Sequence, residues 1–188
     1  MNIFDFDGTI YNGDSTVDFF FWSLRRHPGL VRYLPSQIGG FLRYFLKRST
    51  KTQAKENFYQ FLQGIVAKKE VPLFWESHRK NIFPWYLERK APTDIIISAS
   101  PEFLLSPICE QLGVAKLLAS RVDPETGHYD GINCHGAEKV RRLYDACRIR
   151  ACDEFYTDSK ADYPLARIAD RAYMIRRGVP KPFTPPEA

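Results

Sequence analysis

The chain has 188 residues, 44% of them hydrophobic and 26% charged, and a net charge of +5. This size and composition suit one domain, or one core with an insertion, and exclude a disordered or fibrous chain. No apolar run reaches the ~18 residues that a membrane-spanning helix needs. The sequence starts without the basic and then apolar segments of a secretory signal, so we expect a cytoplasmic protein with reduced cysteines.

The first part of the chain predicts one strand followed by helices. Asn2–Phe6 has the short apolar pattern of a buried strand. Residues 13–80 have helical periodicity. Glycine, proline and hydroxyl residues predict breaks in this region at Pro28-Gly29, Pro35, Gly39-Gly40 and Ser49-Thr50.

From about residue 81 the pattern alternates between helices and strands. The clearest strand is Asp94–Ile97, which contains three consecutive isoleucines. We expect further strands at 115–119, 154–156 and 172–175, and helices at 81–90, 106–112, 138–146 and 164–168. Such alternation predicts an α/β core with a parallel sheet covered on both faces. Residues 1–12 and 81–188 would form this core, and 13–80 an inserted helical cap.

Acidic and hydroxyl side chains follow three of the predicted strands. Asp5 and Asp7 follow the first, Ser98 follows the isoleucine strand, and Asp158 and Asp162 follow the strand at 154–156. Ligands of open α/β sheets bind beyond the carboxyl ends of the strands. We therefore expect these side chains to meet at one edge of the sheet.

The residue types at this edge suit phosphoryl transfer with a magnesium ion. Hard carboxylate oxygens favour Mg²⁺, and the Asp5 carboxylate can attack phosphorus to give an aspartyl-phosphate. Lys139 begins a predicted helix and can neutralise the phosphoryl oxygens. Ser98 and the backbone N–H groups of Asp7 and Ala99 can hydrogen-bond those oxygens.

Four short motifs, in this order, resemble those of the haloacid-dehalogenase superfamily, in the branch similar to phosphoserine phosphatase. The motifs are Asp5-Phe6-Asp7-Gly8-Thr9, Ile95-Ile96-Ile97-Ser98, Cys134-His135-Gly136-Ala137-Glu138-Lys139 and Asp158-Ser159-Lys160-Ala161-Asp162. The resemblance implies a Rossmann-like three-layer core with a mainly parallel sheet, plus an inserted all-helical cap. It also implies a phosphoric monoester hydrolase.

The resemblance assigns a role to each motif. Asp5 becomes the nucleophile, and Asp7 the general acid that then activates water, which requires a raised pKa. The phosphoryl group is assigned to Thr9, Ser98, Ala99 and Lys139. Magnesium is assigned to Asp5, Asp7 and Asp158, with Asp162 in support.

Taken one at a time, these motifs have simpler structural explanations. Asp5-Phe6-Asp7-Gly8-Thr9 could be a strand and a turn, Ser98 a helix cap, and Lys139 a solvated lysine. Asp158 and Asp162 could favour the start of a helix. The joint pattern favours the enzyme over a protein that binds phosphate or membrane without turnover.

The stretch 19–55 is aromatic and basic, and it contains no Asp or Glu. Its eight basic residues exceed the net charge of the whole chain: Arg25, Arg26, Arg32, Arg43, Lys47, Arg48, Lys51 and Lys55. One interpretation is a cap that packs on itself and leaves a solvated basic face. Another is a surface that meets an anionic membrane. Nucleic acid would also suit these residues, but no base-reading motif favours it.

The substrate has two candidate classes. Phosphoserine-specific relatives carry a Glu after the first motif, and Asp14 stands at that position here. The runs Gly13-Asp14-Ser15 and Ser98-Ala99-Ser100-Pro101 resemble the C-type phosphatidylglycerophosphate phosphatases. That resemblance implies a lipid head-group phosphate and a peripheral location on the inner face of the membrane. The alternative is a small soluble metabolite similar to phosphoserine.

Overall fold

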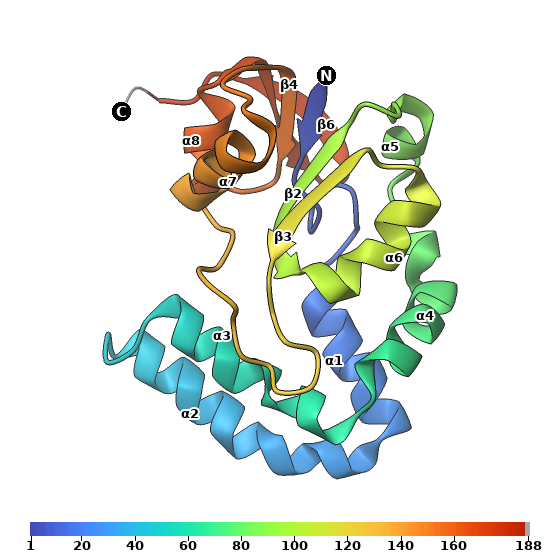
Figure 1. Cartoon of the computed structure of the whole chain (residues 1–188), viewed down its shortest axis with the longest axis vertical. Coiled ribbons are helices and arrows are strands. Elements are labelled where there is room, and N and C mark those ends of the chain that lie inside the picture. Colours follow the sequence, from blue (N-terminus) through green and yellow to red (C-terminus); the bar gives the residue numbers. More distant parts are fainter. Residues whose placement is uncertain (187–188) are drawn as a thin grey trace.

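The computed structural model describes residues 1–186, so the last two residues of the predicted core lie outside the described part (Figure 1). The strands are β1 (Asn2–Phe4), β2 (Ile95–Pro101), β3 (Lys116–Ser120), β4 (Cys152–Thr157), β5 (Ala169–Arg176) and β6 (Val179–Phe183). The α-helices are α1 (Ser15–Arg26), α2 (Leu34–Phe45), α3 (Lys51–Tyr59), α4 (Ala67–His78), α5 (Pro84–Arg89), α6 (Glu102–Leu112), α7 (Ala137–Cys147) and α8 (Tyr163–Ala166). Short 3₁₀ helices span Pro28–Tyr33, Gln60–Gly64, Arg79–Asn81 and Lys160–Asp162.

The strands form one sheet in the order β3-β2-β1-β4-β5-β6. All neighbouring pairs are parallel except β5 and β6, which are antiparallel. The predicted three-layer α/β fold with a mainly parallel sheet is thus confirmed. The sequence did not predict β6, because Pro180 and Pro182 argue against a strand. Both prolines lie in the edge strand of the sheet, where a missing backbone N–H is tolerated.

Alternate residues of the central strands build the two sides of the core. Ile3, Ile95 and Ile97 belong to a cluster that includes Leu143 of α7 and Leu165 of α8. The neighbouring Phe4 and Ile96 belong to the cluster on the opposite face, together with residues of α5 and α6. The period of two in a strand therefore places one helical layer on each side of the sheet (Figure 1).

Five α-helices, α1 to α5, lie between β1 and β2, and α1 to α4 fall within the predicted cap at residues 13–80 (Figure 1). Phe19 of α1 and Trp75 of α4 lie in the same hydrophobic cluster as Phe4 and Ile96 of the sheet. The Trp75 indole N–H also donates a hydrogen bond to the carbonyl of Leu104 in α6 at 2.7 Å. Because α1 and α4 share this cluster with the sheet, the boundary of a separate cap at residues 13–80 stays a prediction.

Helix α2 differs from the sequence expectation in one place. The predicted break at Gly39-Gly40 is wrong, because the helix continues through both glycines. A Cβ on Gly40 would lie 2.6 Å from the Cβ of Asn57 in α3. A glycine is needed here so that the two helices can approach closely, which outweighs its low helix propensity.

Helix α2 and the residue that follows it carry an apolar face that is exposed to solvent. Its side chains have exposed fractions between 43% and 78%: Ile38, Phe41, Leu42, Phe45 and Leu46. A contiguous apolar face of this kind is uncommon on a monomeric protein and indicates an interaction surface. In the described residues, no helix is long and apolar enough to cross a membrane.

The connection from β3 to α7, residues 121–136, runs from the sheet towards α3 and returns (Figure 1). The backbone N–H of Tyr129 donates to the Glu56 carboxylate of α3 at 3.1 Å. The Gln63 amide donates to the carbonyl of Thr126 at 3.2 Å. This segment therefore links α3 and the 3₁₀ helix Gln60–Gly64 to the part of the chain that follows β3.

Candidate active site

The motif residues meet at the carboxyl ends of β1, β2 and β4, as the sequence predicts. Asp5 follows β1 directly, and its backbone N–H donates to the carbonyl of Tyr156 in β4 at 2.9 Å. The strand predicted at Asp94–Ile97 continues to Pro101, so Ser98 lies within β2 and not after it, whereas Asp158 follows the last residue of β4. The three strands are neighbours in the sheet, so their ends share one edge.

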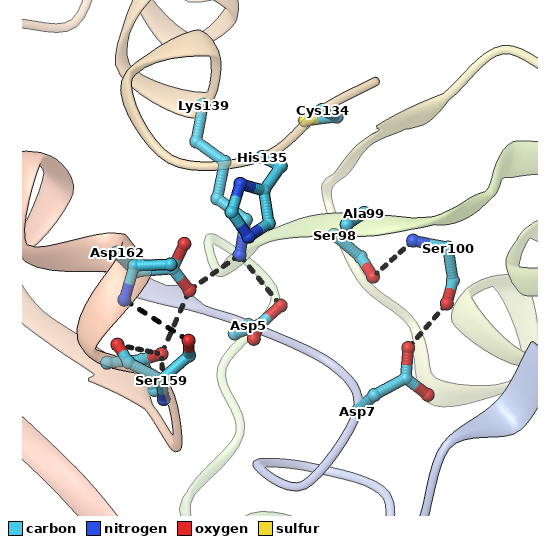
Figure 2. A network of polar contacts seen from close by, with 12 residues as sticks. Asp5, Asp7, Ser98, Ala99, Ser100, Cys134, His135, Lys139, Ser159 and Asp162 are labelled. Atoms are coloured by element: carbon cyan, nitrogen blue, oxygen red, sulfur yellow. Dashed lines mark hydrogen bonds and ion pairs between the residues drawn. The ribbon is translucent and has the colours of Figure 1, made fainter. Parts of the chain in front are cut away.

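Lys139 lies between two carboxylates at this edge (Figure 2). Its Nζ is 2.9 Å from Oδ1 of Asp5 and 2.7 Å from Oδ2 of Asp162. Thr157 also donates to Oδ2 of Asp162 at 2.9 Å. The lysine side chain is only 2% exposed. Asp162 thus contacts and orients Lys139.

The charge of Lys139 is maintained by its partners. Burial lowers the pKa of an amine, but the Asp5 and Asp162 carboxylates outweigh burial and hold the Lys139 pKa above its ordinary value. Lys139 is therefore a permanent cation at the end of β1. It can neutralise the negative charge of a phosphoryl group next to Asp5.

Asp5 is a carboxylate in an environment that disfavours its charge. Burial raises its pKa to about 7, Asp162 and Asp7 add to the rise, and Lys139 opposes it. One lysine thus faces more than one carboxylate. A further cation at this place would lower the pKa of Asp5 and favour its ionised, nucleophilic form.

Asp7 points away from Asp5 and Lys139, as Figure 2 shows. Its Oδ1 accepts from the backbone N–H of Ser15, the first residue of α1, at 2.7 Å. Its Oδ2 accepts from the Ser100 hydroxyl at 2.5 Å. Burial and then Asp14 raise the pKa of Asp7 to about 6, against the hydrogen bonds from Ser100 and Ser15. Asp7 can therefore gain and lose a proton near neutral pH.

Three residues assigned to phosphate binding lie close to this edge. The Ser98 hydroxyl accepts from the backbone N–H of Ser100 at 3.1 Å, and the side chain is buried. The carbonyl of Ala99 accepts from Ser120 Oγ at 3.0 Å. Thr9 is fully buried, and its hydroxyl has no hydrogen-bond partner among residues 1–186. Phosphate binding by Ser98, Ala99 and Thr9 stays a prediction.

Gly8 allows Asp158 to approach the turn that follows Asp5. Gly8 has φ +66°, and a Cβ there would lie 2.2 Å from a carboxylate oxygen of Asp158. Burial raises the pKa of Asp158 as well. The Asp158 carboxylate therefore lies against the turn that carries Asp5 and Asp7.

These oxygen atoms fit part of a magnesium site. Within residues 1–186, no three His, Cys, Asp or Glu side chains converge to enclose a metal. Magnesium is commonly held by one or two carboxylates, with phosphate and water completing its shell. Asp5 and Asp158 can supply the carboxylates. Since the Asp7 carboxylate is turned towards Ser15 and Ser100, its backbone carbonyl is the atom left to serve as a ligand.

Two lysines of α3 reach this edge, and the sequence did not single them out as site residues. Lys55 Nζ donates to the carbonyl of Ala99 at 3.0 Å, and Lys51 Nζ lies 2.8 Å from Nε2 of His135. Burial lowers the pKa of Lys55 to about 8, and Asp14 opposes this effect. The spacing of four between Lys51 and Lys55, which puts both on one helix face, was the available signal.

Asp14 lies at the start of α1, close to Asp7. Its carboxylate accepts from the backbone N–H groups of Thr16 and Val17, both at 3.0 Å, so it caps the helix. Its charge also acts on Asp7 and Lys55. Asp14 is therefore near the site, as predicted, and its role in substrate specificity stays a prediction.

The fold is a three-layer α/β fold, and carboxylates and a buried lysine lie beyond the ends of its strands. This arrangement is typical of a class of hydrolases. The family of haloacid dehalogenase-like hydrolases matches residues 3–167, so the chain belongs to this family. Its relatives include protein CicA of Caulobacter vibrioides, 29% identical over 94% of this chain and 86% of the relative. Another is a histidinol-phosphatase of Neisseria meningitidis, 23% identical over 93% and 89% of the two chains.

Solved structures share the fold. A protein of unknown function from Bordetella pertussis superposes with a TM-score of 0.74 at 21% identity, over 93% of this chain and 88% of that one. A phosphoserine phosphatase bearing a phospho-aspartyl intermediate analogue gives a TM-score of 0.53 at 15% identity, over 92% and 84%. The chain is thus a phosphoric monoester hydrolase of this family, and it shares its fold with phosphoserine phosphatase.

Proposed function

We propose that this chain is a Mg²⁺-dependent phosphatase that forms an aspartyl-phosphate on Asp5 and releases the head-group phosphate of a lipid such as phosphatidylglycerophosphate. The observation that supports this mechanism most strongly is the separation of the two aspartates. Asp5 pairs with Lys139, whereas Asp7 is held on the other side by Ser15 and Ser100. One carboxylate is thus placed for attack and the other for proton transfer.

Asp5 attacks the phosphorus atom, and the alcohol oxygen leaves with the proton of Asp7. Lys139 binds the phosphoryl oxygens during this step, and Ser98 donates its hydroxyl hydrogen to them. Asp7, now ionised, removes a proton from the water that hydrolyses the aspartyl-phosphate. Asp5, Asp158 and the Asp7 carbonyl would hold Mg²⁺, which would supply charge neutralisation at the phosphoryl group.

Removal of the Asp5 carboxylate tests this assignment. We expect Asp5→Asn to abolish phosphate release from an aryl phosphate, while Asp170→Asn, at an exposed position, stays fully active. Chelation of divalent cations should stop the wild-type enzyme, and added Mg²⁺ should restore it. Activity that persists in Asp5→Asn would contradict the role of Asp5.

The lipid substrate is supported by the surface of α2. The exposed apolar face of α2 is accompanied in the sequence by the exposed basic residues Arg43, Lys47 and Arg48. An apolar face bordered by basic residues is the pattern of a helix that lies on an anionic membrane. We propose that α2 docks on such a membrane and brings the head group to the site.

Vesicle flotation tests this docking. We expect the protein to float with vesicles that contain phosphatidylglycerol, and to lose this binding in Phe45→Ser. Phe45 is 78% exposed, so the fold should not depend on it. Val179→Ser, at a 54% exposed apolar position of β6, is the matched control. Failure to bind anionic vesicles at low salt, where surface attraction is strongest, would exclude the membrane interaction.

A small soluble phosphate is the second candidate, because Asp14 is close to the site and could bind an ammonium group. A panel of phosphatidylglycerophosphate, phosphoserine, phosphocholine and sugar phosphates separates the two. The lipid proposal requires kcat/KM to be highest for phosphatidylglycerophosphate. A preference for phosphoserine that is lost in Asp14→Asn would favour the soluble substrate.

A further inference from the structure

A cavity of about 310 Å³ lies between α1, α2 and α3. This volume is at the lower end of the ~300–1,000 Å³ range of small-molecule sites. The lining comes from these three helices and from β2, and it includes Thr16, Phe41, Phe45, Ala54, Lys55, Phe58 and Ser100. The cavity is therefore separate from the ion-paired cluster of Asp5, Lys139 and Asp162.

The inner end of the cavity begins at the hydrogen-bond partners of Asp7. Ser100 donates to the Asp7 carboxylate, and its Oγ lies 2.9 Å from Oγ1 of Thr16. Both Ser100 and Thr16 line the cavity. In the proposed mechanism Asp7 protonates the leaving oxygen. The group attached to that oxygen would then extend past Ser100 into this space.

The walls of the cavity change from polar to apolar with distance from Asp7. Ser100, Thr16 and Lys55 belong to the polar end, and Lys55 is anchored on the carbonyl of Ala99 in β2. Phe41 and Phe45 of α2 lie on the other side, where they are 43% and 78% exposed. The aromatic end therefore opens at the exposed apolar face of α2.

We propose that this cavity binds an apolar chain of the leaving alcohol, so that the substrates are amphiphilic phosphate monoesters whose chain runs from Asp7 to α2. This inference rests on the proposed function, because that function places the leaving oxygen at Asp7. The chain contacts Phe58 and Ala54 and leaves the protein between Phe41 and Phe45. Lys55 provides a positive charge at the polar end, where the substrate carries its polar groups.

Binding of alkyl phosphates tests the cavity without turnover. Ethyl, butyl and hexyl phosphate, each below its micelle concentration, are titrated into Asp5→Asn protein in a calorimeter. Each methylene buried should lower Kd about fourfold, which corresponds to about 0.8 kcal/mol. Ala54→Phe, added to this background, should abolish the dependence on chain length and retain the affinity for ethyl phosphate.

If Ala54→Phe does not fold, a substitution of Phe45 provides a second variant, because the exposed position of Phe45 should tolerate it. Phe45→Ser should weaken hexyl phosphate binding severalfold and leave ethyl phosphate binding unchanged. Equal affinities for the three alkyl phosphates would overturn the inference. So would a chain-length dependence that neither variant alters.

Turnover by the wild-type enzyme distinguishes this inference from the proposed function. If ethyl and hexyl phosphate are both hydrolysed with the same kcat/KM, the phosphatase stands and the inference about the chain fails. If binding depends on chain length but no ester is hydrolysed, the proposed function is wrong and the inference that the cavity binds an apolar chain is supported. Higher kcat/KM for phosphatidylglycerophosphate in vesicles than for monomeric hexyl phosphate identifies the lipid as the source of the chain.

Discussion

Replacement of Lys139 by methionine should strongly destabilise the protein. Lys139 is 2% exposed and is the cation shared by the Asp5 and Asp162 carboxylates, at 2.9 and 2.7 Å. Methionine has a similar length and no charge, so Lys139→Met leaves two carboxylates together without their lysine. Breaking a buried ion pair by removal of one partner costs about 3–5 kcal/mol. We expect a loss of this size in urea unfolding at pH 7.5 with EDTA.

The pH dependence and a second substitution show whether the charge causes this loss. The pKa of Asp5 is already raised to about 7 and should rise further without Lys139. Folded protein then binds protons that the unfolded chain has released, so stability falls as pH rises towards and through that pKa. The loss should therefore shrink at pH 5. Adding Asp162→Asn to Lys139→Met should recover at least about 1 kcal/mol, because one buried charge is removed.

A solvent-exposed lysine close in sequence is the control for this experiment. Lys160→Met should change stability by no more than about 0.5 kcal/mol. A loss below about 1 kcal/mol in Lys139→Met, together with no recovery in the double variant, would refute the view that Lys139 compensates the charges of Asp5 and Asp162.

Three further predictions concern the two aspartates and the turn after them. Ser100→Ala removes a hydrogen bond that lowers the pKa of Asp7, so the alkaline limb of the pH profile of kcat/KM should move up by about one pH unit. An unchanged pH profile would count against Asp7 as the general acid. Gly8→Ala places a Cβ 2.2 Å from the Asp158 carboxylate, so the Mg²⁺ concentration for half-maximal activity should rise at least about tenfold. Asp5→Asn removes a carboxylate whose pKa is raised to about 7, so the destabilising ionised form is lost. In EDTA, Tm should therefore rise by several degrees at pH 8, at about 2–4 °C per kcal/mol, and should not rise at pH 4.

The position of the catalytic edge could be predicted because parallel strands impose it. The isoleucine run of β2 and the motif around Asp5 identify two neighbouring strands. Their carboxyl ends must lie together, whatever the details of packing. The prediction that Asp5, Ser98 and Asp158 meet at one edge of the sheet therefore needed only the order of elements.

Features that depend on long-range contacts could not be predicted in the same way. The Gly39-Gly40 pair has the local pattern of a helix break, but close packing of Gly40 on Asn57 retains the helix. Strand β6 contains two prolines and is allowed only because it lies at the sheet edge. Local propensity is a weak guide where tertiary contacts decide the conformation.

The surroundings of the site were also hidden from the sequence. Ser100 lies only two residues beyond Ser98, but its hydrogen bond to Asp7 joins two positions that are 93 residues apart in the sequence. Lys55 of α3 donates a hydrogen bond to the carbonyl of Ala99, which lies 44 residues further along the chain. The sequence placed the basic residues of 19–55 in one group, and the structure separates them. Lys51 and Lys55 turn towards the site, whereas Arg43 and Lys47 stay on the surface near α2.

The most direct test of the account is the chemical state of Asp5 during turnover. The wild-type enzyme, mixed with substrate and Mg²⁺, is quenched in acid within the first turnover, reduced with borohydride and mapped by mass spectrometry. Reduction converts an aspartyl-phosphate to homoserine, so we predict homoserine at position 5 and unmodified Asp7. Phosphate release without modification of Asp5, or homoserine at another aspartate, would contradict the nucleophilic role of Asp5.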